Sequence, residues 1–235
     1  MKHIFLYALL LIFSGKTFSQ DSVILKSEHE MTTFVMGFLV KGPSWTQDKT
    51  PELAKIQQNH IAHIFSLVDS NKATIAGSFL DNQEIRGIIV FNTDSIELAR
   101  TWESDDPAVQ AGRFSMRFTK WFAGKGIMKH PDTPIVFVKY YFALLKKGPK
   151  WIPVETDEVK KIQKGHMANI NAMAKTGKLV LAGPFFDDGY NRGVFLFKTE
   201  SLEEAQALCT HDPAVQAGRL IVELHPWMVA KGSLP

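Results

Sequence analysis

The apolar positions of the chain follow two spacings that recur in the same order twice. Residues 33–40 and 135–145 are rich in β-branched and aromatic side chains, which is typical of strands. Residues 51–70 and 156–176 carry apolar side chains three or four positions apart, which predicts amphipathic helices. The later elements are two short strands, a second helix and a closing strand, at 73–79, 86–91, 95–102 and 113–121, then at 178–185, 192–197, 201–209 and 219–227. Each half therefore reads as βαββαβ, with Asp94 and Ser201 as candidate N-terminal caps of the second helices.

The two halves are copies of one sequence at an offset of 106 residues. Lys41-Gly42-Pro43 matches Lys147-Gly148-Pro149, and the run Asp106–Arg113 is identical to Asp212–Arg219. Residues 127–134 contain two prolines and no apolar period, as expected of a connector. We therefore expect a first domain over residues 33–127 and a second over residues 134–232.

The βαββαβ order predicts the ferredoxin-like α+β plait, in which two helices pack on one face of a four-stranded antiparallel sheet. The other face of such a sheet is apolar and needs a cover. The second copy in the same chain can supply it. We predict two modules packed sheet to sheet as an internal pseudo-dimer, forming an α+β barrel, with a higher oligomer left open.

The first twenty residues have the layout of a secretory signal peptide. Lys2 and His3 precede an apolar run over residues 4–13, and residues 14–20 are small and polar. The apolar run is about ten residues long, whereas a membrane-spanning helix needs about twenty. We expect a signal over residues 1–20, a secreted or periplasmic protein, and no membrane association after cleavage. A retained N-terminal anchor is the alternative.

Composition and charge narrow the choice of partners. The chain is 45% apolar and 22% charged, as ordinary globular domains are. Its formal charge is only +3, and its lysines are scattered, so no nucleic-acid partner is expected. Cys209 is the single cysteine, which excludes an intramolecular disulfide.

The order of motifs resembles the YCII-related family. It is complete in the second half, as His166, Ala182-Gly183-Pro184-Phe185, Ser201–Ala205 and Asp212-Pro213. The first half departs from it at Ser78, where proline is usual. The resemblance implies a dimeric α+β barrel in which a His and an Asp line a small pocket. Carried across, the implied catalytic pairs are His60 with Asp106 and His166 with Asp212.

A carboxylate beside an imidazole fixes its tautomer and raises its basicity, giving a general acid/base near neutral pH. The structural alternative is that Asp followed by Pro simply starts a helix. The histidines would then be core or boundary residues. Both roles can hold at once.

Arginines and tryptophans are the candidate substrate-binding groups. Arg113 and Arg219 open the closing strands, where each could hold a carboxylate or phenolate oxygen, or neutralise the nearby Asp. Arg86 and Arg192 are secondary candidates, because each can form a hairpin ion pair with Asp81 or Asp187. The paired tryptophans, which suit core packing or a flat cyclic ligand, are Trp45, Trp121, Trp151 and Trp227.

A metal site and an organic cofactor are not expected. His63 lies three residues after His60, so the two could form a metal site with Asp106, but Asn169 stands at the matching place in the second half. No nucleotide fingerprint or nucleophile elbow is present.

The sequence thus favours a cofactor-independent enzyme of the isomerase or lyase kind, acting on a small molecule that is cyclic or anionic. The alternative is a non-catalytic binding or structural module. His–Asp pairs around an open cavity would favour the enzyme, and buried pairs without one would favour the module. Of the two pockets, the second is expected to be the more active, because Pro184 stiffens its wall and His211 adjoins Asp212.

Overall fold

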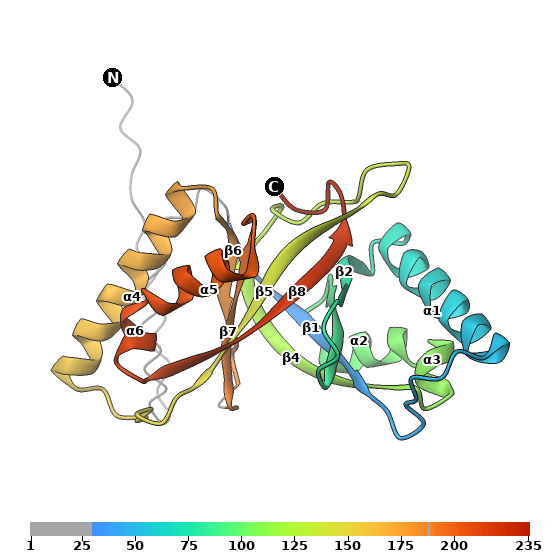
Figure 1. The fold of residues 1–235 in the computed structure, drawn as a ribbon, viewed down its shortest axis with the longest axis horizontal. Coiled ribbons are helices and arrows are strands. Elements are labelled where there is room, and N and C mark those ends of the chain that lie inside the picture. Colours follow the sequence, from blue (N-terminus) through green and yellow to red (C-terminus); the bar gives the residue numbers. More distant parts are fainter. Residues whose placement is uncertain (1–29, 188) are drawn as a thin grey trace.

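Two helical layers flank a curled sheet in this computed structural model, which describes residues 30–187 and 189–235 (Figure 1). The expected signal peptide, residues 1–20, lies outside the described residues. Within the described part of the chain, no helix combines the length and the apolar character needed to cross a bilayer.

The predicted βαββαβ order is confirmed in both halves, with one short helix added to each. The first half contains β1 (Met31–Lys41), α1 (Pro51–Asp69), β2 (Ala73–Phe79), β3 (Ile85–Phe91), α2 (Ile96–Glu103), α3 (Pro107–Gln110) and β4 (Phe114–Gly124). The second contains β5 (Phe137–Lys147), α4 (Asp157–Lys175), β6 (Leu179–Pro184), β7 (Asn191–Phe197), α5 (Leu202–Thr210), α6 (Pro213–Gln216) and β8 (Leu220–Ala230). The short helices α3 and α6 begin at the repeated Asp-Pro pairs.

The strands form one eight-stranded sheet in the order β4-β1-β3-β2-β8-β5-β7-β6. The halves meet at two seams. At one seam β2 pairs antiparallel with β8, with Gly77 opposite Val229 and Phe79 opposite Trp227. At the other, β4 and β6 are joined by an isolated bridge between Trp121 and Phe185. The two seams bring the edges of the sheet together, so the predicted α+β barrel of two facing modules is confirmed.

The core inside the barrel, between the strands of the two halves, contains aromatic side chains from both halves. Trp121 and Trp227 are fully buried there. The ring of Phe38 from the first half lies 6.0 Å from that of Phe185 and 6.4 Å from that of Phe142, both from the second. Two further cores lie outside the sheet, one under each set of helices. Each half thus buries one sheet face with its own helices and the other with its partner half.

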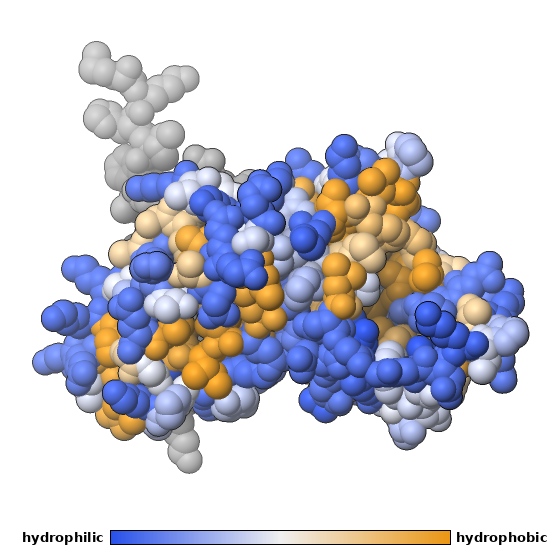
Figure 2. Space-filling model, viewed as in Figure 1, coloured by the Kyte–Doolittle hydropathy of each residue, from blue (hydrophilic) through white to orange (hydrophobic). Residues whose placement is uncertain are grey.

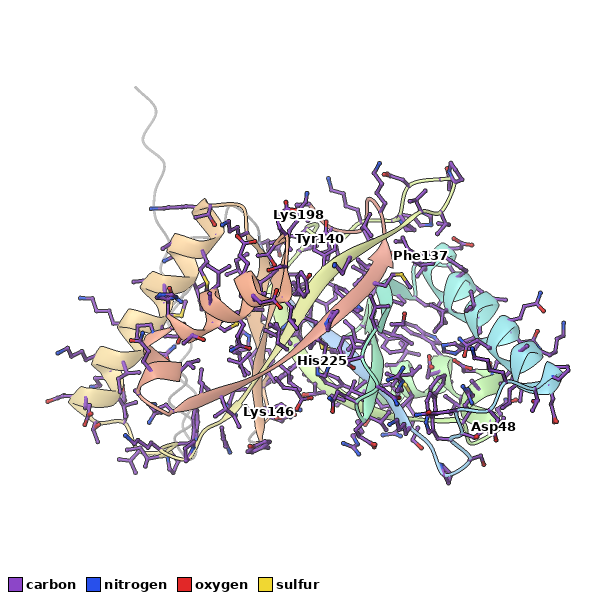
Figure 3. The ribbon with its side chains drawn as sticks, in the orientation of Figure 1. Asp48, Phe137, Tyr140, Lys146, Lys198 and His225 are labelled. Atoms are coloured by element: carbon purple, nitrogen blue, oxygen red, sulfur yellow. The ribbon has the colours of Figure 1, made fainter. Side chains whose placement is uncertain are left out.

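Most of the face shown in Figure 2 is hydrophilic. A hydrophobic area lies at its upper right, near the start of β5, where Val136 and Phe137 are 51% and 52% exposed (Figures 2 and 3). One predicted cap is wrong: α2 is capped by Ser95, whose hydroxyl accepts from the Leu98 N–H at 3.2 Å, and not by Asp94. The helix starts one residue later than expected, which places Ser95 within reach of its third N–H group. The Ser201 cap of α5 is confirmed.

Candidate functional site

A helix and a tight turn bring His60 and Asp106 together. His60 lies on the buried face of α1, and Asp106 caps the short helix α3. One carboxylate oxygen, Oδ1, accepts from the Ala108 N–H at 2.7 Å, and the other, Oδ2, lies 2.5 Å from Nδ1 of His60. Asp106 therefore serves as a helix cap and as a histidine partner at the same time.

The second half repeats this arrangement with one further hydrogen bond. Asp212 caps α6 through the Ala214 N–H at 2.9 Å, and its Oδ2 lies 2.8 Å from Nδ1 of His166. Asn169 also donates to Oδ2, at 3.0 Å. The structure thus places both predicted His–Asp pairs within hydrogen-bonding distance, and it leaves their catalytic role as a prediction.

Both carboxylates are held in the charged form. Burial raises the pKa of Asp212, but hydrogen bonds from His166, Asn169 and Ala214 outweigh burial and hold the pKa below its usual value. Asp106 follows the same balance, with burial opposed chiefly by the bond to His60, and its pKa is also lowered. A charged carboxylate at Nδ1 favours the tautomer with its proton on Nδ1, which leaves Nε2 as the basic nitrogen.

Nε2 of each histidine is the atom that could act on a ligand. Within the described residues, neither His60 nor His166 has a hydrogen-bond partner at Nε2. Each side chain remains 10% exposed, whereas the paired aspartates are fully buried. The imidazoles therefore keep a narrow opening to the outside, while the carboxylates have none.

The Lys-Gly-Pro loops bind the turns that carry these aspartates. The Gly42 N–H donates to the Arg113 carbonyl at 2.9 Å, and the Ser44 N–H donates to the Gly112 carbonyl at 2.9 Å. A Cβ atom on Gly42 would lie 2.2 Å from the Gly112 oxygen, so only glycine fits this close approach. The two most similar segments of the repeat are thus structural partners of each other.

The four predicted arginines gather on two tryptophan rings. The guanidinium carbons of Arg113 and Arg86 lie 4.5 and 5.2 Å from the centre of the Trp45 ring. In the second half, those of Arg219 and Arg192 lie 4.8 and 4.9 Å from the centre of the Trp151 ring. Each half therefore carries a pair of stacked cations on one aromatic ring.

Two of the expected arginine roles are corrected. Arg113 donates to the Thr46 carbonyl at 3.1 Å rather than to Asp106, and Arg219 donates to the Ile152 carbonyl at 3.4 Å rather than to Asp212. The carboxylates of the two aspartates instead bond to the histidines and to the first turns of α3 and α6. Arg86 and Arg192 bind the backbone carbonyls of the hairpins, and not the carboxylates of Asp81 and Asp187.

Aromatic contacts connect the arginine cluster to the His–Asp pair in the first half. In the first half, the Phe114 ring lies 5.3 Å from the ring of His60 and 5.5 Å from that of Trp45. In the second half, the ring of His166 stacks 5.9 Å from that of Phe195. The other tryptophan pair, Trp121 and Trp227, lies in the barrel core and is fully buried, so it cannot line an open ligand site.

Two cavities lie elsewhere in the fold. One, of about 560 Å³, is lined by residues at the ends of β1 and β4 and after β3, including Thr33, Asn92 and Lys125. The other, of about 160 Å³, lies beside the β6–β7 turn and includes Asp187 and Tyr190. Neither is lined by a residue of the His–Asp pairs. His211 also lies apart, since its Nδ1 faces the Ala207 carbonyl at 2.6 Å.

The sequence did not reveal two buried polar residues near the sites. Glu103, at the end of α2, is 1% exposed and lies beside the first pair. His225 on β8 lies between the halves (Figure 3), with Nδ1 2.6 Å from Asp81 and Nε2 2.9 Å from Glu223. The repeat offered one signal, because the matching residues are Cys209 and Thr119, so both positions differ between the copies.

Comparison with known proteins agrees with this architecture. A model of the YCII-related domain family matches residues 140–228. The second half of this chain therefore matches the YCII-related domain family. It contains the complete set of motifs, with His166 and Asp212 bonded as described above. No curated protein matches the chain in sequence.

Solved structures of chlorite dismutases share the two-module fold of this chain. The chlorite dismutase from Candidatus Nitrospira defluvii in complex with imidazole aligns with a TM-score of 0.53 and 11% identity, over 87% of this chain and 92% of that one. A mutant of that enzyme in complex with cyanide aligns with a TM-score of 0.52 and 12% identity, over 86% and 92%. A haem-binding protein from Thermus thermophilus aligns with a TM-score of 0.49 and 13% identity, over 86% and 93%. At these identities the likeness to the chlorite dismutases establishes the fold alone.

Proposed function

We propose that this chain is an enzyme of small-molecule metabolism in which a His–Asp pair moves a proton on an anionic ligand. The observation that carries the proposal is the repeated bond between a buried carboxylate and Nδ1 of a histidine whose Nε2 has no partner among the described residues. A general base must offer a free nitrogen of fixed tautomer, and this arrangement provides one in each half.

The chemistry follows from the groups in each half. Nε2 of His166 takes a proton from the bound molecule, and the charge of Asp212 stabilises the imidazolium that forms. Returning the proton to another atom of the ligand gives an isomerase. Delivering it to a departing group gives a lyase. Arg192 and Arg219, stacked on Trp151, would hold a carboxylate or phenolate oxygen of a flat ligand.

A haem does not fit the residues around His166. The imidazole packs against Phe195, and the space between α4 and the sheet is filled by a close-packed cluster that includes Ile170, Met173 and Phe197. No step of the proposed reaction is routed through such a group.

The second candidate is a non-catalytic binding module, which buried pairs without an adjoining cavity favour. Each histidine is only 10% exposed, and the two described cavities lie away from both pairs. On this alternative the pairs stabilise the fold, and ligands bind at the 560 Å³ cavity. The two candidate functions predict different turnover after a histidine of the pairs is replaced.

The deciding experiment starts from a thermal-shift screen of small carboxylates, phenolates and enolisable keto acids with the full-length mature protein. Any ligand that raises the melting temperature is then assayed for turnover. His166→Ala should reduce turnover by about 100- to 10,000-fold, the usual effect of losing an acid/base group. His60→Ala should reduce it less, and His211→Ala, a matched control outside the pairs, should leave it unchanged. Unchanged turnover in both His166→Ala and His60→Ala would make the histidines packing residues.

We also propose that the protein is exported, on the order of charged, apolar and polar residues in the first twenty positions. N-terminal sequencing of protein recovered from the periplasm or the medium should start near residue 21. Recovery of chains that begin at Met1 would contradict export by a cleaved signal.

A further inference from the structure

The first His–Asp pair has two polar neighbours that the second pair lacks. His63 lies one turn along α1 from His60, and Glu103 ends α2. Nε2 of His63 is 3.9 Å from Oε2 of Glu103. One ligand atom from each of His63, Glu103 and Asp106 falls within 4.8 Å of the others.

These neighbours are buried without hydrogen-bond partners. The Glu103 side chain is 2% exposed, and neither of its oxygens is bonded within the described chain. Nε2 of His63 is likewise buried and unbonded. A buried polar atom with no partner is costly, and an imidazole nitrogen beside a carboxylate that is unbonded at both oxygens points to a missing ligand.

The charges around Glu103 make the same point. Burial, the negative charge of Asp106 and the hydrogen bond that a protonated Glu103 donates to the Asp106 carboxylate raise the pKa of Glu103 to about 9. Burial also lowers the pKa of His63, and the neighbouring His60 acts in the same direction, against the attraction of Asp106. A cation between these residues would restore the charge of Glu103 and would accept the lone pair of a neutral His63.

We propose that the first half contains a metal site in which Nε2 of His63 and the carboxylates of Glu103 and Asp106 bind a divalent transition-metal ion. One imidazole with two carboxylates is a donor set that Zn²⁺ accepts, and three protein ligands leave a fourth position open. Zn²⁺ holds its ligand atoms about 2.0–2.2 Å from the ion. The three side chains must therefore move closer together than the 4.8 Å within which their ligand atoms now lie. The side chain of His63 is 13% exposed and that of Glu103 is 2% exposed, so an ion would enter past His63.

His60 gains a role from this arrangement. Its Nδ1–H already bonds to the carboxylate of Asp106. A histidine that donates to a ligand carboxylate orients it toward the ion, and such partners strengthen metal binding. Asp106 can still bind a metal, because a carboxylate has about four acceptor sites and only two are used here.

The second half shows how the fold satisfies the same place without a metal. Asn169 stands where His63 does and donates to Asp212 at 3.0 Å. Cys209 stands where Glu103 does and is fully buried. The two copies thus differ in the residues that would bind the ion, and the second copy supplies substitutions that the fold already tolerates.

The test is zinc binding by the full-length, tag-free protein, measured by calorimetry with Zn²⁺ alone. One ion per chain is expected. His63→Asn, which places the residue of the second copy in the first, and the isosteric Glu103→Gln should each weaken binding at least about 100-fold, the upper range for loss of even an outer partner. Circular dichroism will verify that both variants fold.

Two controls lie outside the cluster. His211→Ala removes an exposed histidine, and Glu97→Gln removes an exposed carboxylate from the same helix as Glu103, so both should bind Zn²⁺ as the unaltered protein does. Absence of binding up to about 1 mM Zn²⁺ would overturn the proposal, as would binding that is undiminished in Glu103→Gln. Because the readout is binding and not turnover, the result is independent of whether the His–Asp pairs are catalytic.

Discussion

At the scale of single residues, the internal repeat provides natural comparisons between matched positions. Trp121 and Trp227 occupy equivalent places and are equally buried. The indole N–H of Trp121 donates to the Gly183 carbonyl at 3.1 Å, whereas that of Trp227 has no partner within the described residues. The two indoles therefore differ in one hydrogen bond.

Replacing each tryptophan with phenylalanine isolates that bond. Both substitutions leave a similar cavity, but Trp121→Phe also breaks a buried hydrogen bond, while Trp227→Phe removes an unbonded donor. Trp121→Phe should lower the free energy of unfolding by about 1–3 kcal/mol more than Trp227→Phe does. Urea unfolding of the two variants will measure the difference. Equal losses would mean that the Trp121–Gly183 bond contributes nothing net.

Asp212 should make the fold sensitive to acid. Its pKa is depressed in the folded protein, so its contribution to stability is complete above the unfolded value of about 3.9 and is lost as pH falls through the folded pKa. Between about pH 5 and pH 2, the free energy of unfolding should fall more steeply in the unaltered protein than in Asp212→Asn. The exposed Asp94→Asn is the control and should keep the original slope. Parallel curves for the unaltered protein and Asp212→Asn would contradict the assignment.

The sequence could predict some site residues and not others. The repeat and the family resemblance identified His60, Asp106 and their equivalents, because these positions are identical in both copies. Glu103 was not predicted, since a glutamate near the end of a helix is usually solvent-exposed, and its burial beside His63 and Asp106 depends on the tertiary fold. The hydrogen-bond partners predicted for the arginines were wrong. They bond to backbone carbonyls of loops, and the path of a loop cannot be read from hydrophobic periodicity.

At the scale of elements, the Lys-Gly-Pro loop and the Asp-Pro turn act as one unit. Gly148 donates to the Arg219 carbonyl at 2.8 Å, and a Cβ atom there would lie 2.4 Å from the Gly218 oxygen. The loop therefore holds the turn that presents Asp212 to His166.

Gly148→Ala should separate the loop from the turn. The backbone clash should cost about 1–3 kcal/mol of stability, as overpacking generally does, and should weaken any ligand binding at the second site. Gly177→Asn is a suitable control, because Gly177 has open space around it and asparagine tolerates its positive φ of 74°. Chemical denaturation of both variants provides the measurement. An unchanged unfolding midpoint in Gly148→Ala would show that the loop adjusts without strain.

The long helices and strands could be predicted from hydrophobic periodicity, because an element of several residues contains enough apolar positions to show its spacing. The helices α3 and α6 have four residues each, which is barely one turn, so no period can be read. Their Asp-Pro starts were the only local sign. The misplaced cap at Asp94 has a similar origin, since a helix start depends on which side chain reaches the free N–H groups.

At the scale of the whole molecule, the halves share a single aromatic core and should not fold separately. A fragment of residues 30–130 would expose the inner face of its sheet, including Phe38 and Trp121. We expect it to dimerise or aggregate, with the second copy of itself replacing the missing half. Sedimentation will measure the oligomeric state of the fragment. A monomeric fragment that folds cooperatively would contradict the shared core.

The two seams of the barrel are unequal, and this determines where the molecule opens locally. The β2–β8 seam is a ladder reinforced by the buried His225, which bonds a carboxylate from each half. The β4–β6 seam has an isolated bridge in place of a ladder. Three hydrogen bonds support it: the hydroxyl bond of Thr119 to Asp187, the indole bond of Trp121 to Gly183 and the Phe186 N–H bond to Lys120. Local opening should therefore start between β4 and β6. The Phe186 amide proton, which bonds to the Lys120 carbonyl across that seam, should exchange with deuterium faster than the Leu80 amide proton, which bonds to the Pro226 carbonyl across the other seam. One side of the barrel would then stay paired through β2 and β8 while the other side opens and closes between β4 and β6.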